Sequence, residues 1–169
     1  QQRFSNGDGL TSSSPIIIEN QLFNSFKIQN TNLYVEVRNC TLNNIAITQS
    51  ENIMFIDCNF IKSTSSNVEI SFGNCLNILI TQSNEPISKL RIDHCYNTSI
   101  INNHFGSGDY SLKLWNSSSV ILQNNTFVDS NIFIYQSINW LKNIHKCFEN
   151  KLKWNLGKPS INYFLVWPI

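Results

Sequence analysis

Carboxylates are the first candidates for catalysis in this sequence, because cleavage of a glycosidic bond needs two acids close together. Glu69, Arg91 and Lys113 recur at one outward position of the repeat described below. A single carboxylate between two bases is typical of a surface salt-bridge ladder. Four aspartates fall at different positions of that repeat: Asp57, Asp93, Asp109 and Asp129. The sequence therefore favours a protein without catalytic residues.

Patterns for metals and cofactors are weak. His94 has no second ligand at a spacing that suits zinc, and His145 and Cys147 are two ligands only two residues apart. The sequence contains no glycine-rich phosphate loop and no nucleophile elbow. We therefore predict no cofactor and no metal site.

The cysteines are more informative about structure than about chemistry. Cys40 and Cys58 occupy the same position of consecutive repeat copies, so that their Cα atoms are expected one strand spacing apart. That spacing is compatible with a Cys40–Cys58 disulfide and equally with two stacked free thiols. Cys75 and Cys95 are expected in corners of adjacent turns and form a weaker candidate pair, which leaves Cys147 over.

Composition excludes several classes of partner. The net charge is +1 and only 14% of residues are charged, so the chain has no field that attracts nucleic acid or an acidic membrane surface. Polarity comes from 26 asparagines and 21 serines. No apolar run is long enough to span a bilayer. We expect neither a nucleic-acid partner nor a membrane span.

Four N-glycosylation acceptor sequences point to an extracellular or cell-surface location. Their asparagines are Asn39, Asn97, Asn116 and Asn124. The chain begins at Gln1 and has no initiator methionine, which we interpret as a processed form.

Internal repetition is the strongest pattern in the chain. Triplets of apolar, polar and apolar residues, which are typical of short strands, recur every 19 to 23 residues. They are Phe26-Lys27-Ile28, Ile45-Ala46-Ile47, Val68-Glu69-Ile70, Leu90-Arg91-Ile92, Leu112-Lys113-Leu114 and Ile132-Phe133-Ile134. Their middle residues are expected to form one outward column.

A nine-residue element follows each of the first five triplets, with copies that begin at Tyr34, Asn52, Asn77, Asn97 and Ser119. Positions two and four are mostly apolar, position six favours Asn or Asp, and position nine is usually Phe or Leu. The residues expected to point inward are Val35, Val37, Ile53, Phe55, Ile78, Ile80, Ile100, Val120 and Leu122.

This periodicity selects one architecture. Short strands at a nearly fixed interval, with no helical period before about residue 140, leave no crossover helix for a βαβ sheet. We predict an all-β fold, a single-stranded right-handed parallel β-helix (solenoid) of about six to seven coils with N- and C-terminal caps. Residues 1–14 are expected to form the N-terminal cap, 15–137 the coils, and 138–169 a C-terminal cap with an apolar terminal strand.

The same residues resemble a known family. Gly7-Asp8-Gly9-Leu10-Thr11 and Pro15-Ile16-Ile17-Ile18-Glu19-Asn20 are similar to the entry segment of extracellular β-helix repeat proteins of the pectate-lyase-like superfamily, including its NosD-like branch. The turns that begin at Asn97 and Ser119 are similar to that family's repeat unit. The resemblance covers residues 7–137 and implies the fold, whereas such coils serve as lyases, hydrolases, adhesins and structural proteins alike.

Apolar residues at outward positions suggest a contact surface. In the nine-residue elements they are Met54, Ile56, Leu79, Ile101 and Ile121. The terminal segment adds Tyr163, Phe164, Val166, Trp167 and Ile169, which need a partner strand. We therefore expect a non-enzymatic structural subunit that packs against copies of itself. The alternative is a carbohydrate-binding or carbohydrate-cleaving β-helix, with a polysaccharide as partner and stacking from outward aromatic residues: Trp115, Phe133, Tyr135 and Trp140.

Overall fold

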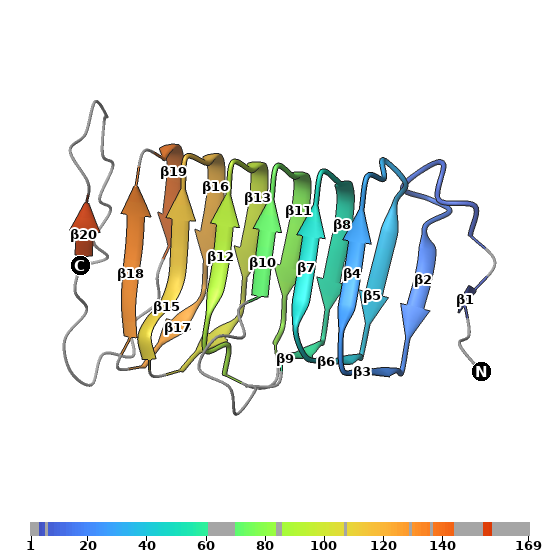
Figure 1. The fold of residues 1–169 in the computed structure, drawn as a ribbon, viewed down its shortest axis with the longest axis horizontal. Coiled ribbons are helices and arrows are strands. Elements are labelled where there is room, and N and C mark those ends of the chain that lie inside the picture. Colours follow the sequence, from blue (N-terminus) through green and yellow to red (C-terminus); the bar gives the residue numbers. More distant parts are fainter. Residues whose placement is uncertain are drawn as a thin grey trace.

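The computed structural model describes residues 4–5, 7–60, 70–83, 86–106, 108–128, 130–135, 137–143 and 154–156. Within these residues the chain coils through three sides, and each turn stacks on the one before (Figure 1). Two sides are long sheets and the third is a row of two-residue strands. The N-terminus lies at one end of the stack, and the coils advance towards the other end (Figure 1).

We call the larger sheet sheet one. Its strands, in spatial order, are β1 (Phe4–Ser5), β2 (Ile16–Glu19), β5 (Val35–Arg38), β8 (Glu51–Ile56), β11 (Leu76–Thr81), β13 (Tyr96–Ile101), β16 (Ser118–Gln123) and β19 (Ile138–Asn143). Sheet two contains β4 (Phe26–Gln29), β7 (Ile45–Thr48), β10 (Ile70–Gly73), β12 (Leu90–Asp93), β15 (Gly108–Trp115), β18 (Ser130–Tyr135) and β20 (Trp154–Leu156). The short side contains β3 (Leu22–Phe23), β6 (Thr41–Leu42), β9 (Asn59–Phe60), β14 (His104–Phe105) and β17 (Thr126–Phe127).

The pairing confirms a parallel β-helix. Every described strand pair is parallel except β1 with β2. There the first strand pairs antiparallel along the edge of the first coil. Five described turns carry a strand on all three sides, so the stack has about five turns, slightly fewer than the six to seven expected. No helix occurs among the described residues. Strands β19 and β20, which fall in the segment expected to be a cap, continue the parallel stack.

The core follows from the alternation of inward apolar and outward side chains along the nine-residue element. All nine residues predicted to point inward are buried, and seven of them have no exposed surface. Phe55 lies at the centre of an aromatic cluster, with its ring centroid 6.1 Å from Phe26, 6.1 Å from Phe60 and 5.8 Å from Phe72. Later in the stack, Phe105 and Phe127 lie parallel with centroids 4.6 Å apart. The inward columns therefore form one continuous apolar core.

Left-handed backbone turns make the corners. Sixteen described non-glycine residues have positive φ, and eleven of them are asparagines. Asparagine tolerates this region better than other residues with a Cβ. Position six of the nine-residue element is always one of these corner residues: Asn39, Asp57, Gln82, Asn102 and Asn124. The need for left-handed corners therefore explains much of the asparagine content.

The predicted register of the third triplet is wrong by two residues. Phe72 pairs with Ile47 and Ile92, and Ser71, not Glu69, lies between Ala46 and Arg91. A shift by two residues keeps the same side chains on the same face, so alternation alone could not decide between the two registers. Glu69 lies outside the described residues, and the expected ladder of Glu69, Arg91 and Lys113 is replaced by a column with Ser71 in place of Glu69.

Candidate functional site

The outward side chains of β8, β11, β13 and β16 form two columns in the predicted register. The first column contains Met54, Leu79, Ser99 and Ile121, and the second contains Ile56, Thr81, Ile101 and Gln123. All are half-buried except Gln123, which is exposed. We call these two columns the outer face of sheet one. The predicted interface residues of the coil are therefore brought together on one surface.

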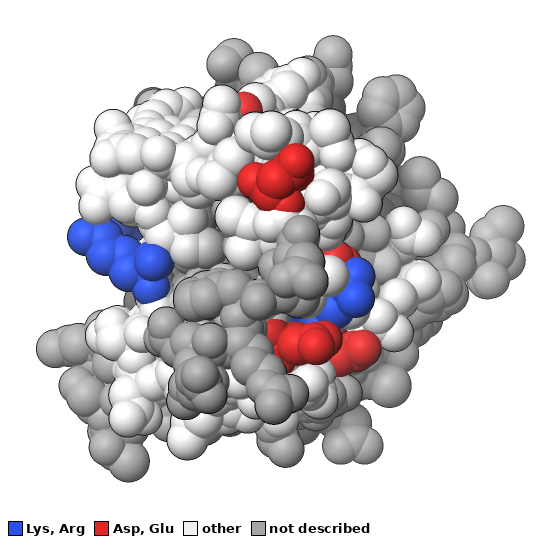
Figure 2. Space-filling view, turned by 90° about the vertical axis from the view of Figure 1, so that its right-hand side faces the viewer, with Lys and Arg blue, Asp and Glu red and all other residues white. Residues whose placement is uncertain are grey.

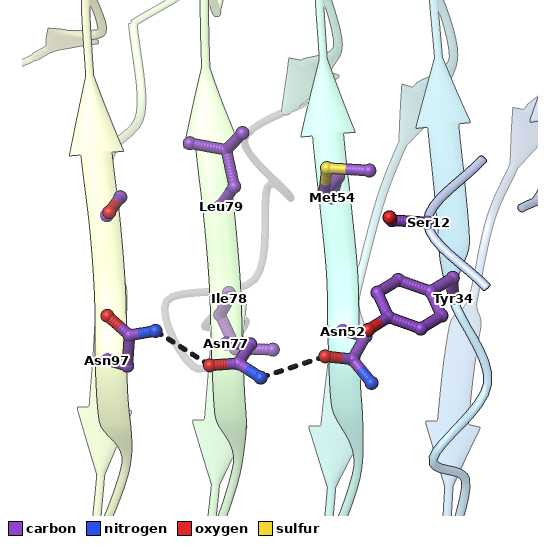
Figure 3. Close-up of a pocket in the computed structure, with 9 residues that line it drawn as sticks. Ser12, Tyr34, Asn52, Met54, Asn77, Ile78, Leu79 and Asn97 are labelled. Carbon is purple, nitrogen blue, oxygen red and sulfur yellow. Dashed lines mark hydrogen bonds between the residues drawn. The ribbon is translucent and has the colours of Figure 1, made fainter.

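An amide ladder borders the outer face (Figure 3). Asn52, Asn77 and Asn97 occupy position one of successive nine-residue elements and have left-handed backbones. The Nδ2 atom of Asn97 donates to Oδ1 of Asn77 at 2.7 Å, and Nδ2 of Asn77 donates to Oδ1 of Asn52 at 2.9 Å. Nδ2 of Asn52 donates to the Asn32 carbonyl at 3.1 Å. Stacked asparagines in a coil are expected to form amide ladders, and asparagine at position one of three successive copies was the sequence signal for this one.

A groove of about 240 Å³ lies over this ladder and the first column. Its lining residues are Ser12, Tyr34, Asn52, Met54, Asn77, Ile78, Leu79, Asn97 and Ser99. Ser12 and Tyr34 lie at its N-terminal end (Figure 3). Tyr34 N donates to the Gly9 carbonyl at 2.8 Å, and Ile16 N donates to the Tyr34 carbonyl at 2.8 Å, which fixes the loop that carries Ser12. We call this loop and Tyr34 the N-terminal wall.

Charge is nearly absent from the outer face of sheet one. Next to it, on β5, an NH2 nitrogen of Arg38 lies 2.5 Å from a carboxylate oxygen of Glu36, whose side chain is 8% exposed. From β8 to β16 the only charged side chain on sheet one is Glu51, at the start of β8. At the N-terminal end of the coil, the described surface carries separate acidic and basic groups and one place where acidic and basic groups lie side by side (Figure 2).

The outward side of sheet two is different. Arg91 lies 2.6 Å from a carboxylate oxygen of Asp93, and Nδ1 of His94 lies 2.7 Å from the other oxygen. Nζ of Lys113 lies 5.1 Å from the centroid of the Trp115 ring, and Trp115 packs against Tyr135 with centroids 4.6 Å apart. Of the four aromatic residues predicted at outward positions, Trp115 and Tyr135 are therefore exposed neighbours. Phe133 is half-buried, and the side chain of Trp140 lies outside the described part of the structure.

Two columns of small polar side chains point inward at the corners. At the end of sheet one the column contains Cys40, Cys58, Ser83, Asn103 and Asn125, and at the end of sheet two it contains Ser50, Cys75, Cys95, Ser117 and Ser137. Eight of these residues donate from the side chain to the carbonyl two residues before them. Each of these carbonyls also accepts a backbone N–H from a corner residue of the preceding turn, so the inward side chain adds a second hydrogen bond at each corner.

The described cysteines are free thiols, so the structure does not contain the Cys40–Cys58 disulfide and shows the stacked alternative. Parallel stacking keeps the Cβ atoms about 4.8 Å apart, whereas a disulfide needs roughly 3.5–4.5 Å. The Sγ atom of Cys40 donates to the Arg38 carbonyl at 3.2 Å, and Sγ of Cys58 donates to the Val37 carbonyl at 3.4 Å. Cys75 and Cys95 stack in the same way, and Cys147 lies outside the described residues.

Burial controls the pKa of Cys40 and Cys58, and a hydrogen bond between the two thiols controls the pKa of Cys75 and Cys95. Desolvation raises the pKa of Cys40, and it raises the pKa of Cys58 from 9.0 to about 12. The hydrogen bond between the side chains of Cys75 and Cys95 lowers the pKa of Cys75 to about 7 and raises the pKa of Cys95. Within that pair, Cys75 is the thiol that loses its proton first.

The four predicted glycosylation acceptors have different surroundings. Asn39 donates from Nδ2 to Oδ1 of Asn20 at 2.6 Å, and Asn97 belongs to the amide ladder. Asn116 and Asn124 are exposed at left-handed corners. All four acceptors are surface residues. The predicted interface residues Tyr163, Phe164, Val166, Trp167 and Ile169 lie outside the described residues.

Comparison of the sequence with protein-family models and with curated proteins finds no match. In the described ranges, no three His, Cys, Asp or Glu side chains gather closely enough to hold a metal ion. That part of the chain also has no helix with the length and apolarity needed to cross a membrane.

Proposed function

We propose that this protein is a non-enzymatic structural subunit of an extracellular or cell-surface assembly, and that it associates with copies of itself. The observation that supports this proposal is the outer face of sheet one, where apolar side chains gather with almost no charge. Exposed apolar patches on soluble proteins commonly mark contact surfaces. The high content of asparagine and serine and the four glycosylation acceptors support the extracellular or cell-surface location.

The outer face is also a rigid surface. Its side chains stand on strands that are paired on both sides, and the amide ladder links three consecutive turns. A surface that is already ordered loses little conformational entropy when it binds. The coil therefore presents a preformed contact surface, which suits a building block that repeats.

The test is the mass of the particle in solution. Sedimentation and negative-stain electron microscopy of the wild-type protein should show dimers or larger assemblies whose fraction rises with concentration. Leu79→Glu places a charge in the middle of the outer face and should give monomers, because association would bury that charge without a partner. The matched control is Ala46→Glu, at an outward position of sheet two, which should leave assembly unchanged. Wild-type protein that stays monomeric at every concentration contradicts the proposal.

The predicted terminal strand is a second element of this proposal. Residues 161–169 contain six large apolar side chains besides Tyr163, and an added strand would bury them. A chain truncated at residue 160 that stays folded but no longer assembles supports a strand exchanged between subunits. A truncated chain that unfolds indicates that the segment caps its own coil.

Carbohydrate binding is the second candidate function, and the aromatic pair on sheet two favours it. Trp115 is 36% exposed and Tyr135 is 38% exposed, and Lys113 extends over the Trp115 ring. Exposed rings beside a cation can stack on sugar rings, including acidic ones. Affinity electrophoresis through neutral and acidic polysaccharides tests this function: retarded wild-type protein with normal migration of Trp115→Ala supports it, and equal migration of both contradicts it.

A further inference from the structure

We infer that Asn97 carries an N-linked glycan, and that the first sugars of this glycan lie in the groove on the outer face of sheet one. A glycan in this place shields the face from a second chain. The site and the placement of the glycan stand on their own observations, whereas the shielding rests on the proposed self-association.

Asn97 is the acceptor that lines the groove. It is exposed, and it begins the acceptor sequence Asn97-Thr98-Ser99, in which Ser99 supplies the required hydroxyl. Ser99 lies on the same outer side of β13 and lines the same groove. The three other acceptors come directly after the last residue of a strand, and the groove lining contains none of them: Asn39, Asn116 and Asn124. The position of Asn97 therefore distinguishes it from the other acceptors.

The atom of Asn97 that receives a sugar is already oriented. Its Nδ2 faces Asn77 and donates to Oδ1 of that residue at 2.7 Å (Figure 3). A primary amide nitrogen has two hydrogens, and N-glycosylation replaces one of them. The remaining hydrogen can keep the bond to Asn77. The ladder can therefore hold the attachment point in place while the sugar is bound to it.

The amide ladder has an open end at Asn97. Asn77 lies between two amides, those of Asn52 and Asn97. On the other side of Asn97 the neighbour in the next turn is Ser119, which has a shorter side chain and no amide. A sugar on Asn97 therefore has room beside it that a sugar on a middle asparagine of the ladder would lack.

The lining of the groove suits a neutral carbohydrate. It includes three asparagines, two serines and Tyr34, and none of its residues is charged. Amides and hydroxyls can donate to and accept from the hydroxyl groups of a sugar. Met54, Leu79 and the ring of Tyr34 add apolar surface, on which the C–H face of a sugar ring can pack. The groove thus offers both kinds of contact within reach of Asn97.

The modification is a group transfer from an oligosaccharide that is joined to a lipid through a diphosphate, catalysed by an oligosaccharyltransferase. The bond between C1 of the first sugar and the diphosphate oxygen breaks, and its electron pair leaves with the lipid diphosphate. A bond forms between C1 and Nδ2 of Asn97, and Nδ2 loses one proton to a base of the transferase. Thr98 is fully buried in the coil, so the transfer has to precede the closure of this turn.

A glycan in the groove changes the character of the outer face. It covers Met54 and Leu79, which belong to the apolar column on which the proposed contact depends. Sugars replace this apolar surface by hydroxyl groups and add bulk between two facing sheets. Chains without the glycan can then associate through the outer face, and chains with the glycan stay apart. Occupancy of Asn97 thereby sets the fraction of chains that assemble.

The site and the placement are tested on protein from a secretory host that has the transferase. Mass spectrometry of its glycopeptides should show a glycan on Asn97. The matched control is Ala46→Asn, which creates the acceptor sequence Asn-Ile-Thr at residues 46–48, on the outward side of sheet two. An endoglycosidase that cuts between the first two sugars should release the Asn97 glycan from folded protein at least about tenfold more slowly than the glycan at position 46, because the groove covers the bond that is cut. In unfolded protein the two rates should be equal.

The shielding is tested at Ser99, which is outward and not part of the ladder. Ser99→Ala removes the acceptor sequence and keeps Asn97, whereas Ser99→Thr keeps the acceptor. In sedimentation of protein from the same host, Ser99→Ala should associate and Ser99→Thr should stay monomeric. The double variant Ala46→Asn/Ser99→Ala carries its glycan on the other sheet and should associate like Ser99→Ala. Circular dichroism should show that all these variants are folded, because both positions point away from the core.

The outcomes separate this inference from the proposed function. An unmodified Asn97 overturns the inference, and release of the Asn97 glycan as fast as the glycan at position 46 overturns its placement in the groove. Equal association of Ser99→Thr and Ser99→Ala overturns the shielding and leaves self-association standing. Monomeric wild-type protein from a host without the transferase contradicts self-association and leaves the glycan in its groove.

Discussion

The two long sheets have the same interior and different exteriors. Both line the core with buried aliphatic and aromatic columns, for example Ile53 and Ile78 on sheet one and Leu90 and Leu112 on sheet two. Outward, β11, β13 and β16 of sheet one carry apolar side chains, hydroxyls and amides without a charged residue, whereas sheet two carries Arg91, Asp93, Lys113 and exposed aromatic rings. The difference indicates that the coil needs only its inward half, and that the outward half is free to specify contacts.

Truncation in the shared interior should have the largest effect. Phe55→Ala removes a fully buried ring that contacts three other phenylalanines and should lower the free energy of unfolding by about 3–5 kcal/mol. The adjacent outward variant Met54→Ala should cost less than about 1.5 kcal/mol, because its side chain is only half-buried. Urea unfolding of both variants measures this difference. A loss below about 1 kcal/mol for Phe55→Ala would show that the inward register is wrong.

Removal of a buried corner amide should have the next largest effect. Asn125 is fully buried; its Nδ2 donates to the Ile100 carbonyl at 2.7 Å, and its Oδ1 accepts from Asn103 N at 2.9 Å. Asn125→Ala leaves both partners unsatisfied and should cost about 2–3 kcal/mol. Asn124→Asp, at the neighbouring exposed corner, is the matched control and should be nearly neutral. Equal thermal stability of the two variants would contradict the structural role of the corner column.

Alkaline pH should reveal the buried thiol of Cys58. Its folded pKa of about 12 lies above the 9.0 of an ordinary thiol, so the neutral form is favoured by folding. This contribution is fully present below pH 9 and is lost as pH rises from 9 towards 12, by about 2 kcal/mol at about pH 10.5. Cys58→Ala lacks the titrating group, so its stability relative to wild type should improve over that interval. Parallel stability curves between pH 8 and 11 would refute the assignment.

The smallest expected effect concerns the amide ladder that distinguishes sheet one. Asn77 has a φ of 55°, so Asn77→Ala should cost about 1 kcal/mol through backbone strain and loss of two ladder bonds. Asn77→Gly keeps the backbone conformation and removes only the amide, so it should cost less than Asn77→Ala. Differential scanning calorimetry compares the two. Should both variants match wild type, the ladder does not stabilise the outer face.

Most of the architecture could be predicted from the sequence, because each turn repeats one pattern. The inward columns could be identified from two features of the sequence. These are the interval between triplets and the apolar positions of the nine-residue element, which hold Val35, Phe55 and Ile80. The outward columns of Met54 and Leu79 followed from the same alternation. Side-chain direction in a strand depends on local position alone, so a correct pattern fixes it.

Other features were decided only by the tertiary structure. The register of Ile70–Gly73 depends on how the preceding loop closes, because a two-residue shift leaves the apolar pattern unchanged. The state of Cys40 and Cys58 depends on the separation of stacked Cβ atoms, which their sequence spacing does not determine. The amide ladder and the wall formed by Ser12 and Tyr34 join residues that are distant in sequence. Local pattern therefore determined what each strand buries, and the stacking of turns decided which side chains meet.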